Sequence, residues 1–205
     1  MAEVAAIILA AGGSSRFGRV KQLLEFGGIT LIERTISAAR GAGCNPTVVV
    51  TGSDAAKIAE AINFETVSIV ENENWNRGIG TSIRKGLQQL IELAPQTKAV
   101  VLLVSDQPFV TDEVVTGLIK LWRTQSKPIV ASSYSETLGV PALFDASCFD
   151  ELLQLADDSG AKPIIFKNAD RVSDFPFAEG ATDIDIPTDY EKVGNSPPVR
   201  SPNPG

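Results

Sequence analysis

The residues with the most evident chemistry form a glycine- and cation-rich stretch from Leu9 to Lys21, which follows an apolar run at residues 4–10. Glycine allows backbone to approach a ligand closely, and successive backbone N–H groups in such a turn form a concave site for an anion. Arg16, Arg19 and Lys21 add positive charge nearby. The combination indicates a loop that binds a triphosphate; a plain glycine-rich turn between a strand and a helix is the alternative.

Two widespread phosphate-binding motifs are absent from this stretch. Gly13 and Gly18 have the spacing of a P-loop, but Arg19-Val20 stands where that motif requires Lys-Ser or Lys-Thr. The Gly-x-Gly-x-x-Gly fingerprint of dinucleotide-binding proteins is also missing. The loop must therefore bind phosphate in another way.

One carboxylate is placed to reach that loop. Asp106 follows the apolar run at residues 99–104, and Pro108 turns the chain just after it. A carboxylate beside a triphosphate repels it unless a cation intervenes, and Mg²⁺ binds through one or two carboxylates, water and substrate phosphates. We therefore expect Asp106 to hold Mg²⁺, with Mn²⁺ as the substitute; an exposed turn aspartate is the alternative.

The elements that must position these residues alternate between two patterns. Apolar runs predict buried strands at residues 4–10, 46–51, 67–71 and 99–104, and amphipathic patterns predict helices at residues 30–41, 54–62 and 111–125. Thr30 and Glu33 form a capping box, and Thr111 is a suitable N-cap. This alternation predicts an α/β fold with a parallel sheet covered on both faces. Ligands of such sheets bind at the carboxyl ends of the strands, where the loop and Asp106 should meet.

The composition argues against several classes of protein. A net charge of −7 argues against a general nucleic-acid binder. No apolar segment approaches the length of about 18 residues that a membrane span needs. The chain has no histidine, which excludes histidine-based acid–base chemistry, and its two cysteines are far apart. We expect a cytoplasmic protein with one domain at residues 1–193 and a flexible, proline-rich tail at residues 194–205.

The first loop also resembles a family signature. Leu-Ala-Ala-Gly-x-Ser-x-Arg-x-Gly-x-x-Lys opens the nucleotidyltransferases that resemble molybdenum-cofactor guanylyl- and cytidylyltransferases, and it is matched at Leu9, Ala10, Ala11, Gly12, Ser14, Arg16, Gly18 and Lys21. The resemblance implies that the loop wraps the triphosphate and that Lys21 contacts phosphate oxygens. It implies catalytic roles for Lys21, Arg16 and Asp106, and nucleotide contacts from Leu9, Ala10, Ala11, Gly12, Gly13, Ser14, Lys21 and Asp106.

Three later segments carry the same resemblance. Residues 72–83 are similar to Asn-x-x-Trp-x-x-Gly-Met-Gly-x-Ser-Leu of the cytidylyltransferase branch, which implies that Gly80 and Ser82 lie near the nucleobase; ordinary helix capping by Thr81 or Ser82 is the alternative. Asp106 matches the metal-binding Asp-x-x-Pro. Asp185 matches the second metal-binding acid in Asp-x-Asp-x-Pro-x-Asp-Tyr, with Asp183 a weaker candidate.

The acceptor side departs from the family pattern. The family commonly has Gly-His-Pro where this chain has Gly139-Val140-Pro141, and Lys162 could meet an acceptor phosphate or be a solvated loop lysine. Strands are expected at residues 129–133 and 138–144, and helices at residues 147–155 and 160–168. The missing histidine leaves the acceptor open.

The resemblance extends over residues 7–193 and implies a three-layer, Rossmann-like nucleotidyltransferase fold of the GT-A-like type with a mostly parallel sheet. It predicts an enzyme that transfers CMP from CTP to the phosphate of the molybdenum-pterin cofactor and releases pyrophosphate. A molybdenum hydroxylase is the expected recipient of the product. The alternatives are transfer to a sugar or polyol phosphate, and a non-catalytic carrier of the cofactor.

Overall fold

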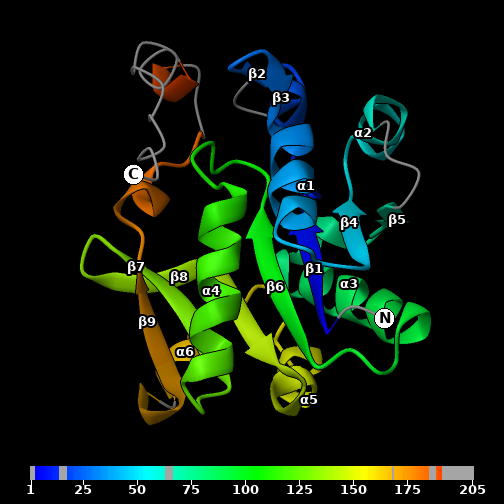
Figure 1. Ribbon diagram of the computed structural model, residues 1–205. Coiled ribbons are helices and arrows are strands. Elements are labelled where there is room, and N and C mark those ends of the chain that lie inside the picture. The colour runs from blue at the N-terminus through cyan, green and yellow to red at the C-terminus, as the bar shows by residue number, and fades with distance from the viewer. Residues whose placement is uncertain (1–2, 14–17, 63–66, 168, 185–187, 191–205) are drawn as a thin grey trace.

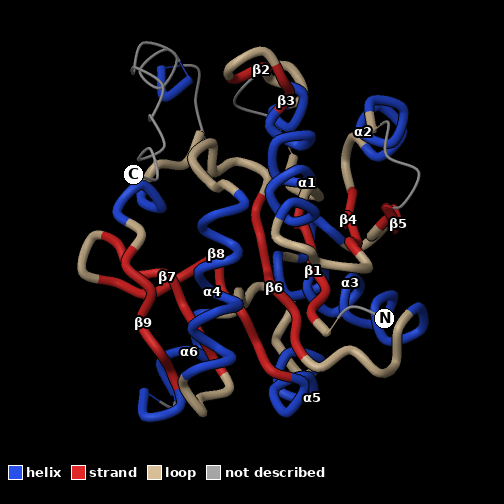
Figure 2. Tube along the Cα trace, in the orientation of Figure 1, coloured by secondary structure: helices blue, strands red, loops and turns tan. Residues whose placement is uncertain are grey.

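The structure is a computed structural model that describes residues 3–13, 18–62, 67–167, 169–184 and 188–190 (Figure 1). Its centre is a seven-stranded sheet with the strand order β5-β4-β1-β6-β8-β7-β9. The strands are β1 (Val4–Leu9), β4 (Thr47–Thr51), β5 (Val67–Glu71), β6 (Ala99–Val104), β7 (Ile129–Tyr134), β8 (Thr137–Asp145) and β9 (Val172–Pro176). Figure 2 shows β5 and β9 at opposite ends of the sheet.

Helices cover both faces of this sheet. They are α1 (Leu31–Gly41), α2 (Ala55–Ala61), α3 (Ile79–Leu93), α4 (Asp112–Thr124), α5 (Phe149–Leu153) and α6 (Lys162–Lys167). Apolar side chains of α1, α2 and α4 pack into one core, and those of α3, α5 and α6 pack into another. The result is the predicted three-layer α/β arrangement with a mostly parallel sheet.

Strand β1 shows why its sequence is apolar throughout. Ala5, Ile7 and Leu9 enter the core that contains α3, whereas Ala6 and Ile8 enter the core that contains α1 and α4. Alternate residues of a strand point to opposite faces, so a strand buried on both faces has no polar position. This double burial fixes the end of β1, from which the first loop departs.

The predicted helix starts are confirmed. Thr30 accepts a hydrogen bond from the Glu33 amide at 3.3 Å and donates its own amide to the Glu33 carboxylate at 3.0 Å, which completes the capping box of α1. The side chain of Thr111 accepts from the Val114 amide at 3.4 Å and caps α4.

The second half of the sheet differs from the first. Within the seven-stranded sheet of the described residues, β8 is the strand that runs antiparallel to both of its neighbours, because it forms a hairpin with β7 and inserts between β7 and β6. Ser135 and Glu136 at the hairpin turn both have positive φ, as tight hairpins require. Neither β9 nor the short hairpin of β2 (Glu25–Phe26) and β3 (Ile29–Thr30) was predicted. Strand β9 carries an aspartate and ends in a proline, as an edge strand can, and therefore lacks an apolar run.

Candidate active site

The first loop is anchored by a buried glutamine. Gln22 is 2% exposed, and its Nε2 donates to the carbonyl oxygens of Ala10 at 3.0 Å and Gly12 at 3.1 Å. Leu9, Ala10 and Ala11 are buried, whereas Gly12 and Gly13 are exposed. Gln22 thus holds the start of the loop by both amide hydrogens and leaves the glycine backbone open to solvent. Sequence reasoning missed this residue, although it directly follows the signature lysine.

Lys21 and Asp106 lie together at the carboxyl edge of the sheet. Lys21 begins a 3₁₀ turn, Lys21–Leu23, and its Nζ lies 2.7 Å from Oδ2 of Asp106, with 15% and 25% of the two side chains exposed. Asp106 is placed there by the end of β6, where the Ser105 amide donates to the Leu9 carbonyl at 3.3 Å. The two residues come from positions 85 apart in the chain. The expected meeting of the loop lysine with Asp106 is therefore present.

The segment predicted to lie near the nucleobase is held by contacts within the protein. Helix α3 begins at Ile79, with Gly78 as its N-cap and no side-chain capping bond, so capping by Thr81 or Ser82 is not observed. Nδ2 of Asn72 donates to the hydroxyls of Thr81 at 2.8 Å and Ser82 at 2.9 Å. The Gly80 amide donates to the Asp157 carbonyl at 2.9 Å.

Trp75 lies between this segment and the first loop. A Cβ added to Gly13 would sit 3.2 Å from the Trp75 ring, and one added to Gly52 would sit 2.8 Å from its Cγ. The tryptophan therefore packs against both backbones.

The acceptor side is organised around Val140. Nε2 of Gln107 donates to the Val140 carbonyl at 3.2 Å, and the Tyr134 hydroxyl donates to the same oxygen at 3.0 Å. Burial, and then the negative charge of Asp183, raises the pKa of Tyr134. Lys162 is exposed, and its Cε would lie 3.6 Å from a Cβ added to Gly139. Lys162 therefore flanks the backbone that borders the expected acceptor site.

Comparison with known proteins agrees with this geometry. A family described as the MobA-like NTP transferase domain matches residues 6–172. The chain belongs to this family. Its members are nucleotidyltransferases, so the transferase class predicted from the sequence is confirmed.

Three known proteins are similar to this MobA-like chain. It is 25% identical to the molybdenum cofactor cytidylyltransferase of Escherichia coli K12, over 93% of this chain and 95% of that protein. It is 34% identical to nicotine blue oxidoreductase of Paenarthrobacter nicotinovorans over 57% of this chain, and spans 55% of that protein's length. The crystal structure of Rv0371c from Mycobacterium tuberculosis H37Rv is 27% identical, with a TM-score of 0.83 over 95% of this chain and 98% of that one.

The described site offers a partial fit to a divalent cation. A carboxylate oxygen of Asp106 already holds a cation, the Lys21 ammonium, and oxygen is the donor that Mg²⁺ and Mn²⁺ prefer. Residues 3–13, 18–62, 67–167, 169–184 and 188–190 contain no group of three or more histidine, cysteine, aspartate or glutamate side chains that could hold a metal. Asp106 would therefore be one ligand beside substrate phosphates.

Several predicted residues cannot be placed. Ser14, Arg16 and Asp185 lie outside the described residues. The residue before Asp185 is described: the Ile184 amide donates to the Asp106 carbonyl at 3.0 Å. The backbone that leads to Asp185 thus reaches the residue proposed as the first metal ligand.

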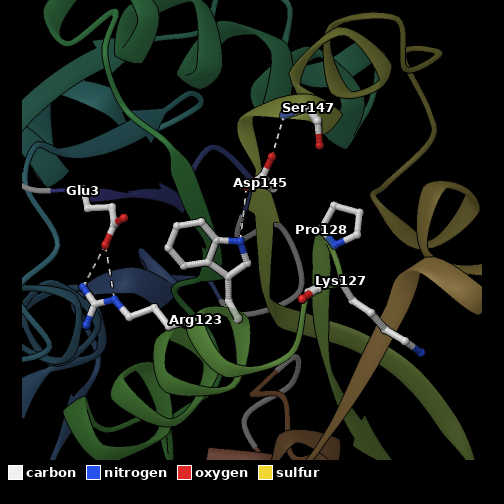
Figure 3. A pocket seen from close by; sticks show the side chains of 8 residues that line it. Glu3, Arg123, Lys127, Pro128, Asp145 and Ser147 are labelled. Carbon is white, nitrogen blue, oxygen red and sulfur yellow. Dashed lines mark hydrogen bonds and ion pairs between the residues drawn. The ribbon is translucent and has the colours of Figure 1, made fainter.

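A cavity of about 550 Å³ lies elsewhere in this MobA-like chain. Figure 3 shows Glu3 and Arg123 facing one another at its wall, and Asp145 beside Ser147. Asp145 pairs with Ala99, the first residue of β6, whereas Asp106 follows the last residue of that strand. The cavity is therefore at the opposite edge of the sheet from Lys21 and Asp106.

No helix in the described part of the chain has the length and apolar character to cross a bilayer.

Proposed function

We propose that this nucleotidyltransferase moves CMP from CTP to the phosphate of the molybdenum-pterin cofactor and releases pyrophosphate. The observation that carries the proposal is the contact between Lys21 and Asp106 beside the open Gly12–Gly13 backbone. The similarity to a molybdenum cofactor cytidylyltransferase over nearly the whole chain supports this choice of nucleotide and acceptor. A molybdenum hydroxylase is the proposed recipient of the product.

The reaction needs no general base from the protein. An oxygen of the acceptor phosphate attacks the α-phosphorus of CTP and forms a new P–O bond. The bond from the α-phosphorus to the bridging oxygen breaks, and pyrophosphate leaves with the electron pair. A phosphate monoester has a second pKa of about 6 and is mostly a dianion at neutral pH, so no proton has to be removed. A chain without histidine can therefore catalyse the transfer by positioning and charge stabilisation.

The first loop supplies the nucleotide contacts in this proposal. Backbone N–H groups of Gly12 and Gly13 cradle the phosphates, with Ser14 and Arg16 completing the loop, and Gly80 and Ser82 lie on the nucleobase side. Lys21 exchanges the Asp106 carboxylate for phosphate oxygens when the nucleotide binds. The partly buried ammonium of Lys21 thereby has an anionic partner both without and with bound nucleotide.

Asp106 and Asp185 are the proposed ligands of Mg²⁺ or Mn²⁺. When bound, such an ion neutralises charge at the α-phosphate. The manganese complex of Rv0371c, 25% identical over 95% of this chain, supports a divalent metal in this group of proteins. Once Lys21 has turned to the phosphates, the Asp106 carboxylate is available for the ion.

A matched activity screen tests the proposal. The full chain is incubated with Mg²⁺ and CTP, GTP, ATP or UTP, each with the molybdenum-pterin cofactor, a sugar phosphate or no acceptor, and pyrophosphate is measured. We expect release that requires both CTP and the pterin cofactor. Tight cofactor binding without release would instead identify a carrier, and release with a sugar phosphate alone would reassign the acceptor.

An oxidoreductase is the second candidate, because one relative is named nicotine blue oxidoreductase and shares 34% identity over 118 residues. A parallel assay adds the full chain and a hydride donor, NADH or NADPH, to nicotine blue and follows the absorbance of the dye. The charged pair of Lys21 and Asp106 favours phosphate chemistry, so we expect no change in that absorbance.

A further inference from the structure

Gln107 is a buried polar residue at the centre of the candidate site. It directly follows Asp106 and is 3% exposed. Its Nε2 donates to the Gly180 carbonyl at 2.8 Å and to the Val140 carbonyl at 3.2 Å. Both amide hydrogens are thus used, and each goes to a different segment of the chain.

The first of these segments leads to the acidic residues near the carboxyl end. The hydrogen bond from Gln107 holds Gly180, and the Asp106 carbonyl accepts the Ile184 amide at 3.0 Å. Two consecutive residues therefore hold both ends of the segment from Gly180 to Ile184. Ile184 is fully buried, in a cluster with Leu24 and Leu31, which adds an apolar anchor at the same end.

The second segment is the part of β8 that borders the expected acceptor. The Val140 carbonyl accepts from both Gln107 and Tyr134. The Tyr134 ring also packs on Gly180, where an added Cβ would lie 2.7 Å from a ring carbon. Gln107, Tyr134, Val140 and Gly180 therefore form one connected contact set.

The amide is held entirely through its nitrogen. Oε1 of Gln107 is buried and has no hydrogen-bond partner among the described residues. An unpaired buried carbonyl is unfavourable, so the two N–H bonds must account for the presence of an amide at this place. A side chain of similar size without these donors would fill the space and release both segments.

We propose that Gln107 is a positioning residue that holds the Gly180–Ile184 segment and the Val140 backbone at a fixed distance from Asp106. Its effect on catalysis rests on the function proposed above, because the segment leads to the second proposed metal ligand and Val140 borders the acceptor. Its effect on the position of the Gly180–Ile184 segment does not depend on that function.

The test compares Gln107→Met with Gln22→Met, since both glutamines are buried and both donate twice from Nε2. Amide hydrogen exchange of the full chain is measured across residues 177–184. We expect Gln107→Met to speed exchange of the Ile184 amide about 10-fold or more, while Gln22→Met leaves it unchanged. In the transfer assay we expect Gln107→Met to lower kcat about 10- to 100-fold with KM for CTP within about 2-fold of wild type, and Gln22→Met mainly to raise that KM.

The two readouts separate the inference from the proposed function. Unchanged protection of Ile184 in Gln107→Met overturns the inference whatever the activity. Faster exchange with unchanged kcat overturns the positioning role and leaves only a structural contact. If wild type transfers no nucleotide, the proposed function fails, and Mn²⁺ affinity measured by electron paramagnetic resonance replaces kcat: we expect it to weaken in Gln107→Met only. Gln107→Asn, whose uncharged amide is one methylene shorter and cannot span both carbonyls, serves if the methionine variant does not fold.

Discussion

Two buried glutamines organise the two sides of this site in different ways. Gln22 donates to Ala10 and Gly12, which are two residues apart in one loop, whereas Gln107 donates to Val140 and Gly180, which lie 33 and 73 residues away from it. The start of the first loop is therefore held by a glutamine from the same short stretch. The acceptor side is assembled from three distant segments and depends on the tertiary fold.

This difference indicates where substrate choice can change. A locally defined loop keeps its shape as long as its own sequence is kept, and residues 9–21 retain every fixed position of the signature. The acceptor side can be altered by a change in any of its segments, and Val140 in place of the family's histidine is such a change. We therefore expect variants on the two sides to separate nucleotide binding from acceptor use.

Removal of Asp106 should have the largest effect, because this residue is shared by both sides. We expect Asp106→Ala to reduce transfer at least about 100- to 1,000-fold through loss of the metal ligand, and to lower Tm, because the Lys21 ammonium, with 15% of its side chain exposed, loses its contact with this carboxylate. Pyrophosphate release and thermal melts measure both quantities. Glu3→Ala is the control, because Glu3 also pairs with a lysine, Lys98, and lines the cavity at the opposite edge of the sheet. A near-normal rate in Asp106→Ala would remove Asp106 from the metal site.

Replacement of Lys21 should weaken nucleotide binding and free the carboxylate of Asp106. We expect Lys21→Met to raise KM for CTP about 10-fold or more, since a partly buried ammonium that contacts phosphate is lost. The same variant should bind Mn²⁺ more tightly in the absence of nucleotide, because Asp106 no longer holds an ammonium. Titrations followed by electron paramagnetic resonance measure this affinity, with Lys57→Met as the surface control. Equal Mn²⁺ affinity in Lys21→Met and wild type would contradict the proposed exchange of partners by Lys21.

Variants of two glycines near the first loop distinguish a packing role from a nucleotide-binding role. A Cβ on Gly52 would lie 2.5 Å from the Ala11 carbonyl oxygen, whereas one on Gly12 would meet no atom of the described, non-neighbouring residues within 4 Å. We expect Gly52→Ala to destabilise the fold by about 1–3 kcal/mol, which corresponds to a fall in Tm of several degrees. Gly12→Ala should leave Tm unchanged and raise KM for CTP, because the added methyl group occupies the open backbone proposed to cradle phosphate. Unchanged KM in Gly12→Ala would place the phosphates elsewhere.

The sequence predicted β1 and the start of α1 because their patterns are local. A doubly buried strand and a capping box can each be recognised from a short stretch of residues, whereas the short β2–β3 hairpin between them was missed. The meeting of Lys21 with Asp106 followed from one general rule, that ligands lie at the carboxyl edge of the sheet. Gln22 and Gln107 were missed because their importance comes from carbonyl partners that no local pattern reveals. The insertion of β8 and the pairing of β9 with β7 are likewise long-range events.

The smallest predicted effect concerns the contacts between the start of α3 and the loop at residues 155–159. Arg84, on α3, donates to the Leu155 carbonyl and to the Asp157 carboxylate, and Arg77 also pairs with Asp157. The hydrogen bond from Arg84, with further help from Arg77, holds the pKa of Asp157 below its ordinary value. The pKa of an aspartate in an unfolded chain is about 3.9. Because the folded pKa is lower, the stability contributed by Asp157 is present above that pH and is lost as the pH falls through the folded pKa.

We therefore expect Arg84→Met to lower the urea midpoint at pH 6 and to lower it less at pH 3. The decrease at pH 3 should not vanish, because the bond from Arg84 to the Leu155 carbonyl does not titrate. Asp157→Asn isolates the titrating part: its midpoint should differ from wild type at pH 6 and approach it at pH 3. A loss in Asp157→Asn that is equal at both pH values would show that the carboxylate does not stabilise the loop by its charge. In that case the loop at residues 155–159 would be held to α3 by backbone contacts alone, such as the bond from the Gly80 amide to the Asp157 carbonyl.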